Sequence, residues 1–346
     1  MFIMSSLILS APKLNMVYMF PDTLRAESFS SYGLKLQTTP NLDAFAKDAV
    51  RFEQVHVQHT QCTPSRVAML TGRYMHVLGH RTQTHLIQSY EPNYFRTLKS
   101  HGVHVQYYGK NDAFSPDSMN LSVSYWSRDI GVASGPNAYR YGEAGYWSML
   151  ASGSNVSKDD VSNGDYRAIK KASAWMADAP PEPFLLFLPG RGAHPPYGAP
   201  REFQHKWSSD LTKLQAAVEL RPPGDPRKPG YHSTTVGVPH YRNLSSLPHD
   251  DFYRIQGTYL GMISYTDYLF GELLDGIKAA GLYERTAIFF SSDHGDFAGD
   301  YHASALGLQP SMSTPPSPPR SLFSPLPLLS PLAHRSRVRA PRREDG

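Results

Sequence analysis

The sequence LNMVYMFPD, residues 14–22, is an apolar run that ends in a proline and a carboxylate. Its length and apolar character predict a buried strand over Leu14–Phe20, with Asp22 directly after it. Further runs of this kind are predicted strands, at Arg51–Val57, Val103–Tyr108, Phe184–Leu188 and Thr286–Phe290. Helical patterns lie between them, at Asn41–Val50, Pro64–Thr71, Tyr94–Ser100, Tyr166–Ala177 and Asp251–Ala280. This alternation predicts an α/β fold with a mostly parallel central sheet, whose functional site lies at the carboxyl ends of the strands.

Composition divides the chain into three parts. Residues 1–13 are apolar but lack a basic start, so we interpret them as a leader or an uncertain start. Residues 14–302 carry all the predicted strands and helices and form one expected domain. Residues 303–346 are rich in Pro, Ser and Arg and show no amphipathic period, which is typical of a disordered tail. Inside the domain, Ala113–Ser162 and Arg221–His249 are polar and irregular, and we expect them to be long surface insertions.

The formal net charge of +4 resides in the tail, since residues 303–346 hold six arginines and two acidic residues. The remaining chain is balanced, so charge gives no support to a nucleic-acid-binding surface. No stretch approaches the roughly 20 apolar residues that a membrane span requires. Three glycosylation sequons, at Asn120, Asn155 and Asn243, are weak evidence for a secreted protein. The sequence therefore predicts neither nucleic-acid binding nor a membrane span.

The only cysteine of the chain, Cys62, lies in the sequence CTPSR, residues 62–66. Thr63 is a good N-cap and Pro64 a good first helical residue, which places Cys62 just before a helix start. Unpaired N–H groups and the positive end of the helix dipole stabilise anions there, and Arg66 can reach back toward the same space. A lone cysteine is often only a small buried hydrophobic residue. This context instead makes Cys62 a candidate nucleophile or the precursor of one.

Chemistry-bearing residues follow four of the predicted strands. Asp22 comes after the first strand, Lys110 lies in YGKND after Val103–Tyr108, and His194 lies in GAHPPY after Phe184–Leu188. The pair Asp293-His294 follows the last strand, in the sequence SSDHG, residues 291–295. Each has an ordinary alternative: a turn-forming Asp, a solvated Lys, or an Asp-His pair that only stabilises a loop. Their shared position at the same edge of the sheet favours one site.

In combination these motifs resemble the sulfatase family of hydrolases. The signature Cys-x-Pro-Ser-Arg is present at 62–66 and continues as LTGRY at 70–74. The stretches Tyr32-Gly33 and TPNLD at 39–43 also resemble the N-terminal pattern of the family. The resemblance implies an alkaline-phosphatase-like α/β/α sandwich, with 14–302 as the N-terminal catalytic domain. It ends near Tyr301, which implies that the smaller C-terminal subdomain of the family is missing.

The resemblance also implies site roles. In the family, a dedicated formylglycine-generating enzyme oxidises the signature cysteine, here Cys62, to formylglycine (3-oxoalanine), and the hydrated aldehyde is the nucleophile. Arg66 and Lys110 would hold the sulfate, and His194 would contact the leaving oxygen. The implied ligands of a divalent cation, Ca²⁺ or Mg²⁺, are these residues: Asp22, Cys62, Asp293 and His294.

Two positions depart from the pattern of the family. Thr23 stands where a second metal-binding Asp is common, and Asp112 stands where many members carry a His. The roles of those family residues are therefore not carried onto Thr23 or Asp112. Arg191, His80 and His85 are further polar residues near the motifs, and we interpret them as structural or solvated.

The resulting hypothesis is a sulfuric ester hydrolase that acts on a small-molecule or carbohydrate sulfate ester. One alternative is a phosphodiester or phosphonate monoester hydrolase of the same superfamily. Another is an inactive, truncated sulfatase-like chain. The resemblance also favours a secretory, lysosomal or extracellular location.

Overall fold

The computed structural model describes residues 14–129, 135–222, 244, 246–302 and 328–329 of the chain. Strands in these residues form one seven-stranded sheet in the order β2-β7-β6-β1-β5-β3-β4. Their bounds are Asn15–Met19 (β1), Val50–Arg51 (β2), His104–Tyr108 (β3), Tyr125–Ser127 (β4), Phe184–Leu188 (β5), Thr286–Phe290 (β6) and Leu328–Leu329 (β7). Strands β6, β1, β5, β3 and β4 run parallel, so their carboxyl ends share one edge. Strand β7 is antiparallel to β6 and β2.

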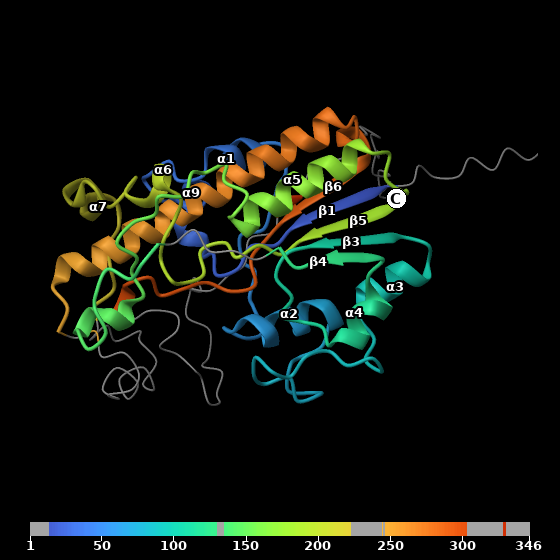
Figure 1. Cartoon of the computed structure of the whole chain (residues 1–346), viewed down its shortest axis with the longest axis horizontal. Coiled ribbons are helices and arrows are strands. Elements are labelled where there is room, and N and C mark those ends of the chain that lie inside the picture. The colour runs from blue at the N-terminus through green and yellow to red at the C-terminus, as the bar shows by residue number, and fades with distance from the viewer. Residues whose placement is uncertain (1–13, 130–134, 223–243, 245, 303–327, 330–346) are drawn as a thin grey trace, which may run out of the picture.

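Helices cover both faces of the sheet and complete an α/β/α sandwich (Figure 1). Helices α1, α5 and α9 lie on one face, and α2, α3 and α4 lie on the other. The helices have these bounds: Pro40–Ala46 (α1), Cys62–Thr71 (α2), Tyr94–Ser100 (α3), Pro116–Ser122 (α4), Gly164–Ala177 (α5), Arg201–Gln204 (α6), Leu211–Ala217 (α7) and His249–Ala279 (α9). Short 3-10 turns are found at Ala26–Ser28, Ser30–Tyr32, Ala144–Ser148, Tyr283–Arg285 and Asp300–His302. The predicted α/β fold with a mostly parallel sheet is confirmed.

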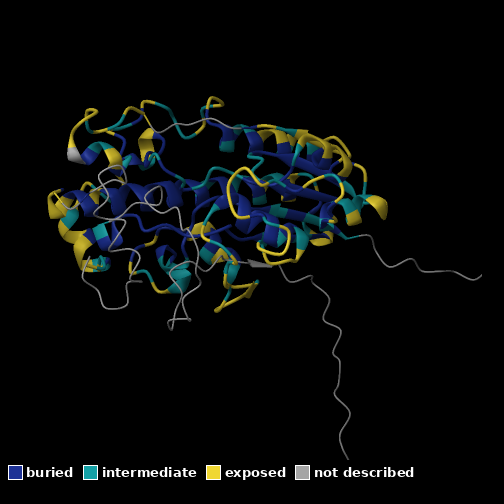
Figure 2. Cartoon of the chain, turned by 90° about the horizontal axis from the view of Figure 1, so that it is seen from below, coloured by how far each residue is buried: buried dark blue, intermediate teal, exposed yellow. Residues whose placement is uncertain are grey.

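Strand β5 lies at the centre of the hydrophobic core, and all five of its residues are buried. Successive side chains of a strand point to opposite faces, so the strand feeds two clusters. Phe184, Leu186 and Leu188 pack on the side of α5 and α9, whereas Leu185 and Phe187 pack on the side of α2 and α3. This two-sided burial explains why an uninterrupted apolar run forms a central parallel strand. Figure 2 shows buried residues in the interior of the molecule and exposed residues at its periphery.

Two predicted elements have a boundary that is wrong by more than two residues. The strand expected over Arg51–Val57 is reduced to β2, and Phe52–Val57 is irregular and mostly exposed. Within the described part of the chain, Phe52–Val57 has no strand to pair with, since β2 is an edge strand whose described partner is the two-residue strand β7. The helix expected over Asn41–Val50 ends at Ala46, and residues 47–49 form a turn before the chain enters β2.

The segments expected to be irregular contain more structure than predicted. Within Ala113–Ser162, α4 and β4 are regular, and β4 extends the sheet beside β3. A three-residue strand with exposed side chains carries no apolar run, which is why the sequence pattern does not reveal it. Most of 303–346 and of Arg221–His249 lies outside the described residues. The pair Leu328–Leu329 is described and forms strand β7, which pairs with β6 and β2.

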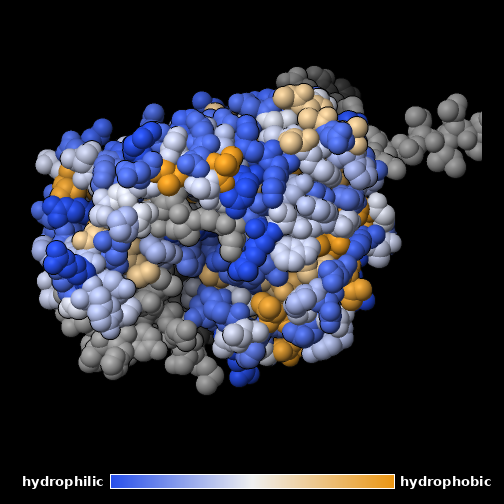
Figure 3. All heavy atoms as spheres, viewed as in Figure 1, coloured by the Kyte–Doolittle hydropathy of each residue, from blue (hydrophilic) through white to orange (hydrophobic). Residues whose placement is uncertain are grey.

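Hydrophilic residues dominate the face seen in Figure 3, and hydrophobic residues occur there in small separate groups. No helix in the described part of the chain is long and apolar enough to cross a membrane.

The buried position of Leu186 yields a prediction for stability. Leu186→Ala should lower the free energy of unfolding by about 2–5 kcal/mol, because it opens a cavity beneath α5 and α9. Leu121→Ala is the matched control, since Leu121 is 43% exposed on α4 and should change stability by less than about 0.5 kcal/mol. Urea denaturation followed by circular dichroism measures both, and equal losses would contradict the assigned core.

Candidate active site

The loops that follow β1, β3, β5 and β6 meet at the carboxyl edge of the sheet. Asp22 follows β1, Lys110 follows β3, His194 follows β5, and Asp293-His294 follow β6. These four strands are consecutive neighbours in the order β6-β1-β5-β3. Parallel pairing therefore joins residues from opposite ends of the described chain, and Nε2 of His294 lies 3.5 Å from Oδ1 of Asp22.

Helix α2 presents Cys62 to this edge. The helix begins at Cys62 itself, with Gln61 as the N-cap, so the prediction of Thr63 as N-cap is wrong. The capping role of Thr63 fails because its backbone N–H already lies within the first turn, where it donates to Oε1 of Gln83 at 2.9 Å. Gly72 ends the helix in the left-handed conformation, as its position after the motif predicts.

Three ionisable groups surround the sulfur of Cys62. Its Sγ lies 3.4 Å from Nε2 of His294, 3.7 Å from Oδ1 of Asp22 and 3.8 Å from Nζ of Lys110. Cys62 is buried, which by itself would also agree with a small hydrophobic core residue. Its neighbours, however, are charged groups rather than the apolar side chains of a core, so the geometry favours a site.

Arg66 ties the ends of β1 and β6 together from one helical turn away. Its Nη2 lies 3.1 Å from Oδ2 of Asp22, and its Nε lies 2.8 Å from Oδ2 of Asp293. Burial alone would lower the pKa of Arg66, but Asp293 and Asp22 raise this pKa well above its ordinary value. The guanidinium is thus a permanent charge inside the protein.

Lys110 contacts the same carboxylate oxygen of Asp22 as Arg66 does. Its Nζ lies 2.5 Å from Oδ2 of Asp22 and 2.8 Å from Oδ2 of Asp112. Burial alone would raise the pKa of Asp22, but Lys110 and Arg66 hold it well below its usual range. Burial would likewise lower the pKa of Lys110, but Asp22 and Cys62 raise it. Both groups are therefore charged at neutral pH.

The four predicted metal ligands lie within reach of one ion. The candidate ligand atoms of Asp22, Cys62, Asp293 and His294 all lie within 4.8 Å of one another, and all four residues are buried. Nδ1 of His294 lies 2.8 Å from the carbonyl oxygen of Gly295, which can only accept, so Nδ1 carries the hydrogen and Nε2 faces the cluster. Histidine ligands are commonly oriented by this kind of second hydrogen bond. The residues present therefore fit a divalent cation.

Thr23 supports the ligands rather than joining them. Its hydroxyl donates to Oδ1 of Asp22, and its backbone N–H donates to Oδ1 of Asp293 at 3.0 Å. Its φ of 66° is unusual for a β-branched residue, and the conformation is held by Tyr259 of α9, whose hydroxyl donates to the Thr23 carbonyl at 2.8 Å. Thr23, at the position where a second Asp is expected from the resemblance, thus donates hydrogen bonds that fix the carboxylates of Asp22 and Asp293.

His194 lies beside the cluster but outside its hydrogen-bonded centre. Burial lowers the pKa of His194; Asp22 opposes this effect and Lys110 reinforces it, so the imidazole is neutral at pH 7. Its Nδ1 lies 2.6 Å from the carbonyl oxygen of Pro195. Since a carbonyl only accepts, Nδ1 carries the hydrogen and Nε2 of the neutral ring is a proton acceptor.

The other polar residues near the motifs have structural contacts. His80 bridges the carbonyl of His85 at 2.6 Å and the carboxylate of Glu91 at 2.9 Å. Arg191 donates to the carbonyl of Pro196 at 2.5 Å, within the loop that carries His194. The interpretation of these residues as structural agrees with their surroundings.

Sequence reasoning missed three residues that position the site. Ser65 donates from Oγ to the backbone carbonyl of Asp293 at 2.6 Å, and Oε1 of Gln83 accepts from the backbone N–H of Thr63 in the first turn of α2. Tyr259 lies in the middle of α9 and holds Thr23. Ser65 belongs to the quoted motif and could have been singled out, whereas nothing local in the sequence distinguishes Gln83 or Tyr259.

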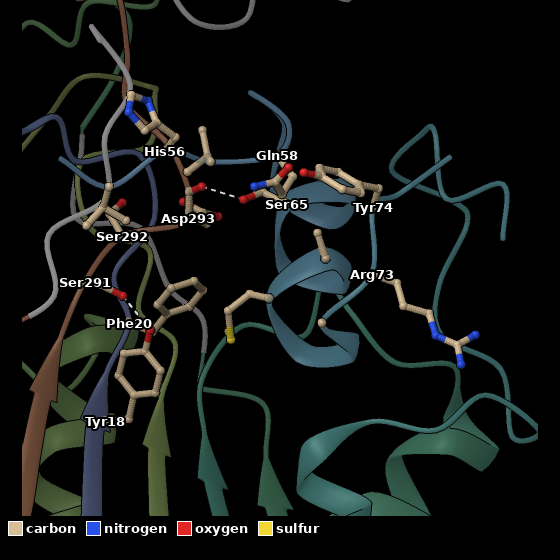
Figure 4. A pocket seen from close by; sticks show the side chains of 15 residues that line it. Tyr18, Phe20, His56, Gln58, Ser65, Arg73, Tyr74, Ser291, Ser292 and Asp293 are labelled. Carbon is tan, nitrogen blue, oxygen red and sulfur yellow. Dashed lines mark hydrogen bonds between the residues drawn. The ribbon is translucent and has the colours of Figure 1, made fainter. Parts of the chain in front are cut away.

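A pocket of about 470 Å³ borders the face of α2 that carries Ser65, Ala68 and Met69. Figure 4 shows Tyr18 and Phe20 on one wall and the hydrogen bond between Ser65 and Asp293 at its edge. Cys62 does not line this pocket, whereas Asp293 does, so that carboxylate lies on the border between the pocket and the charged cluster.

Close backbone contact fixes the loop of His194 against Asp22 and yields a second prediction. Ala193 N–H donates to the Asp22 carbonyl at 3.1 Å, and a Cβ on Gly192 would lie 2.5 Å from that same oxygen. Gly192→Ala should therefore misplace Asp22 and cost more than the roughly 1–2 kcal/mol expected for a left-handed alanine. Gly102→Ala is the control, since Gly102 is also left-handed but has open space around it. Thermal denaturation compares the two, and equal shifts in melting temperature would contradict the contact.

Comparison with known proteins identifies the family of the chain. The family model described as Sulfatase matches residues 14–316. The chain is similar to arylsulfatase K of Xenopus laevis (25% identical; 84% of this chain, 54% of the relative) and to choline-sulfatase of Rhizobium meliloti (26% identical; 83% and 58%). It therefore spans about half the length of these curated relatives.

Solved structures show the same fold. A phosphonate monoester hydrolase of Agrobacterium radiobacter superposes with a TM-score of 0.70 at 17% identity, covering 93% of this chain and 69% of the other. A protein solved with its substrate D-glucosamine-2-N,6-O-disulfate gives a TM-score of 0.61 at 15% identity, covering 92% and 70%. With the family model matching most of its length, this chain belongs to the sulfatase family.

Proposed function

We propose that the chain hydrolyses sulfate monoesters, using a nucleophile formed from Cys62 and a divalent cation held beside it. One observation carries the proposal: the Sγ atom of Cys62, the first residue of α2, lies within 3.8 Å of side-chain atoms of Asp22, Lys110 and His294. Such a cluster of fixed charges suits an anionic ester and the charge that develops on it during reaction.

Cys62 as a thiol and Cys62 as formylglycine suit different ions. A thiolate is a soft ligand and favours zinc or copper, whereas two carboxylates with an oxygen from a hydrated aldehyde favour Ca²⁺ or Mg²⁺. When formed, the hydrated aldehyde supplies a hydroxyl nucleophile for sulfur, and the cation supplies a Lewis acid for a sulfate oxygen. Asp22, residue 62, Asp293 and His294 would hold that cation.

The remaining residues have roles that follow from their charge. Arg66 and Lys110 remain protonated, so they can neutralise sulfate oxygens without gaining or losing a proton. His194 is neutral with Nε2 as a proton acceptor, and the proton that it takes up there can be delivered to the departing alcohol oxygen. The pairing of Asp22 with Lys110 and Arg66 keeps that carboxylate ionised for a cation.

The relatives bear on the substrate only by their names, which include an arylsulfatase, a choline-sulfatase and an ulvan-active sulfatase. We propose a small-molecule or carbohydrate sulfate ester. The second candidate is a phosphodiester or phosphonate monoester, since a phosphonate monoester hydrolase shares the fold.

The first test concerns the nucleophile. The full chain produced together with a formylglycine-generating enzyme should carry an aldehyde at position 62, seen by mass spectrometry of the peptide that contains it. That protein should hydrolyse 4-nitrophenyl sulfate, and Cys62→Ala should lower kcat by at least about 10³-fold, because the nucleophile is gone.

A second substrate and one possible outcome separate the alternatives in this experiment. 4-Nitrophenyl phosphonate monoesters assayed in parallel distinguish the second candidate function. A chain that carries the aldehyde, binds a cation and turns over neither ester is a non-catalytic member of the family, which would contradict the proposal.

The second test concerns the cation. We call the chain that carries formylglycine at position 62 the converted chain. Ca²⁺ or Mg²⁺ at a concentration of a hundred times its dissociation constant should raise the free energy of unfolding of the converted chain by about 3 kcal/mol, seen as a rise in melting temperature. Asp293→Asn should abolish most of this rise, because it removes a buried ligand. Asp275→Asn removes the same charge from an exposed position on α9 and should leave the rise intact. A rise that survives Asp293→Asn would place the ion elsewhere.

A further inference from the structure

We propose that Asp112 makes the site selective for singly charged esters and excludes doubly charged ones such as phosphate monoesters. The proposal rests on the function proposed above and specifies its substrate class. It starts from the ammonium group of Lys110, which lies 2.5 Å from Asp22, 2.8 Å from Asp112 and 3.8 Å from the sulfur of Cys62. The positive charge of Lys110 is thus shared between the buried carboxylate of Asp22 and the carboxylate of Asp112.

Asp112 is the accessible member of this arrangement. Its side chain is 26% exposed and that of Lys110 is 20% exposed, whereas Asp22 and Asp293 are completely buried. An ester that reaches Cys62 through Lys110 therefore meets the Asp112 carboxylate at the solvent side of the cluster. Among the described residues, Lys110 is the only cation that forms an ion pair with Asp112, and the more distant guanidinium of Arg66 also attracts this carboxylate.

The loop that carries Asp112 is held on both sides, so its carboxylate has a defined position. The backbone N–H of Lys110 donates to the Pro189 carbonyl at 2.8 Å, and the Tyr107 hydroxyl donates to the Lys110 carbonyl at 2.6 Å. Beyond Asp112, the backbone N–H of Phe114 donates to Oδ1 of Asn111 at 3.0 Å. These bonds anchor the chain immediately before and after Asp112.

The charge balance then decides which ester is accepted. Asp22 and Asp293 are both paired with Arg66, and Lys110 is the additional cation that contacts Asp22. Asp112 cancels much of the charge of Lys110 toward the solvent. With the divalent cation of the proposed function bound beside Cys62, the charges of Arg66, Lys110 and the cation outweigh those of Asp22, Asp293 and Asp112 by one. The single negative charge of a sulfate ester, phosphodiester or phosphonate monoester is therefore still attracted. A second negative charge is repelled by Asp112, which lowers turnover by roughly tenfold for two charges several ångströms apart near a protein surface.

The experiment compares three substrates with one leaving group at pH 8. They are 4-nitrophenyl sulfate, 4-nitrophenyl methyl phosphate and 4-nitrophenyl phosphate, of which only the last carries two negative charges at that pH. The full converted chain is assayed as wild type, as Asp112→Asn and as the control Asp117→Asn. Asp117 is an exposed carboxylate in the first turn of α4, so its removal changes the net charge equally without touching Lys110.

Asp112→Asn should raise kcat/KM for the doubly charged phosphate about tenfold relative to both singly charged esters, and Asp117→Asn should leave the three ratios unchanged. Unchanged ratios in Asp112→Asn would overturn the inference. An equal gain for both phosphorus esters would also overturn it, because it would indicate selection by the central atom rather than by charge.

Binding distinguishes failure of this inference from failure of the proposed function. If no ester is turned over, calorimetric titration with phenyl sulfate and phenyl phosphate replaces the rates. A gain in affinity for phenyl phosphate alone in Asp112→Asn then supports the role of Asp112, and the absence of such a gain contradicts it.

Discussion

The rest of the site depends on the two ion pairs that the buried guanidinium of Arg66 forms. It bridges Asp22 and Asp293, which follow the adjacent parallel strands β1 and β6. Two buried carboxylates at neighbouring strand ends would repel each other, and loss of a buried partner typically costs about 3–5 kcal/mol. Because Arg66 lies one turn after Cys62 in α2, the same ion pairs that neutralise the carboxylates also set the distance of Cys62 from them. The same ion pairs of Arg66 therefore both position Cys62 and stabilise the two buried carboxylates.

Close backbone packing adds a second level of control. A Cβ on Gly109 would lie 2.3 Å from the Pro189 carbonyl, so the loops after β3 and β5 can touch only through a glycine at this position. Gly192 plays the same part between the loop of His194 and Asp22. These contacts bring the loops of Lys110 and His194 close to Asp22. Tyr259 then connects this layer to the long helix α9, through the carbonyl of Thr23.

The sequence predicts the centre of this fold better than its edges. Strands β5 and β6 and helix α3 have the predicted bounds, because an apolar run buried on both faces or a regular helical period leaves few alternatives. Edge elements fail for the opposite reason. Among the described residues, the alternating segment Arg51–Val57 has no strand partner beyond Arg51, and β4 is too short and exposed to have a pattern. The site follows the same logic. Asp22, Lys110 and Asp293 could be placed together in advance, since residues after neighbouring parallel strands must meet. The support of Thr23 by Tyr259 joins residues separated by 236 positions, and no local signal in the sequence marks such a contact.

Hydrolysis of an aryl sulfate in ¹⁸O-labelled water, compared between the chain with formylglycine at position 62 and Cys62→Ala, tests the central claim most directly, namely that an oxygen nucleophile at position 62 attacks sulfur. Cys62→Ala should release no labelled sulfate. The account predicts cleavage of the sulfur–oxygen ester bond, with the label in the released sulfate and none in the phenol. Label in the phenol would contradict it, because water would then have attacked carbon and the arrangement of Cys62, Arg66 and Lys110 around the sulfate would have no part in the reaction.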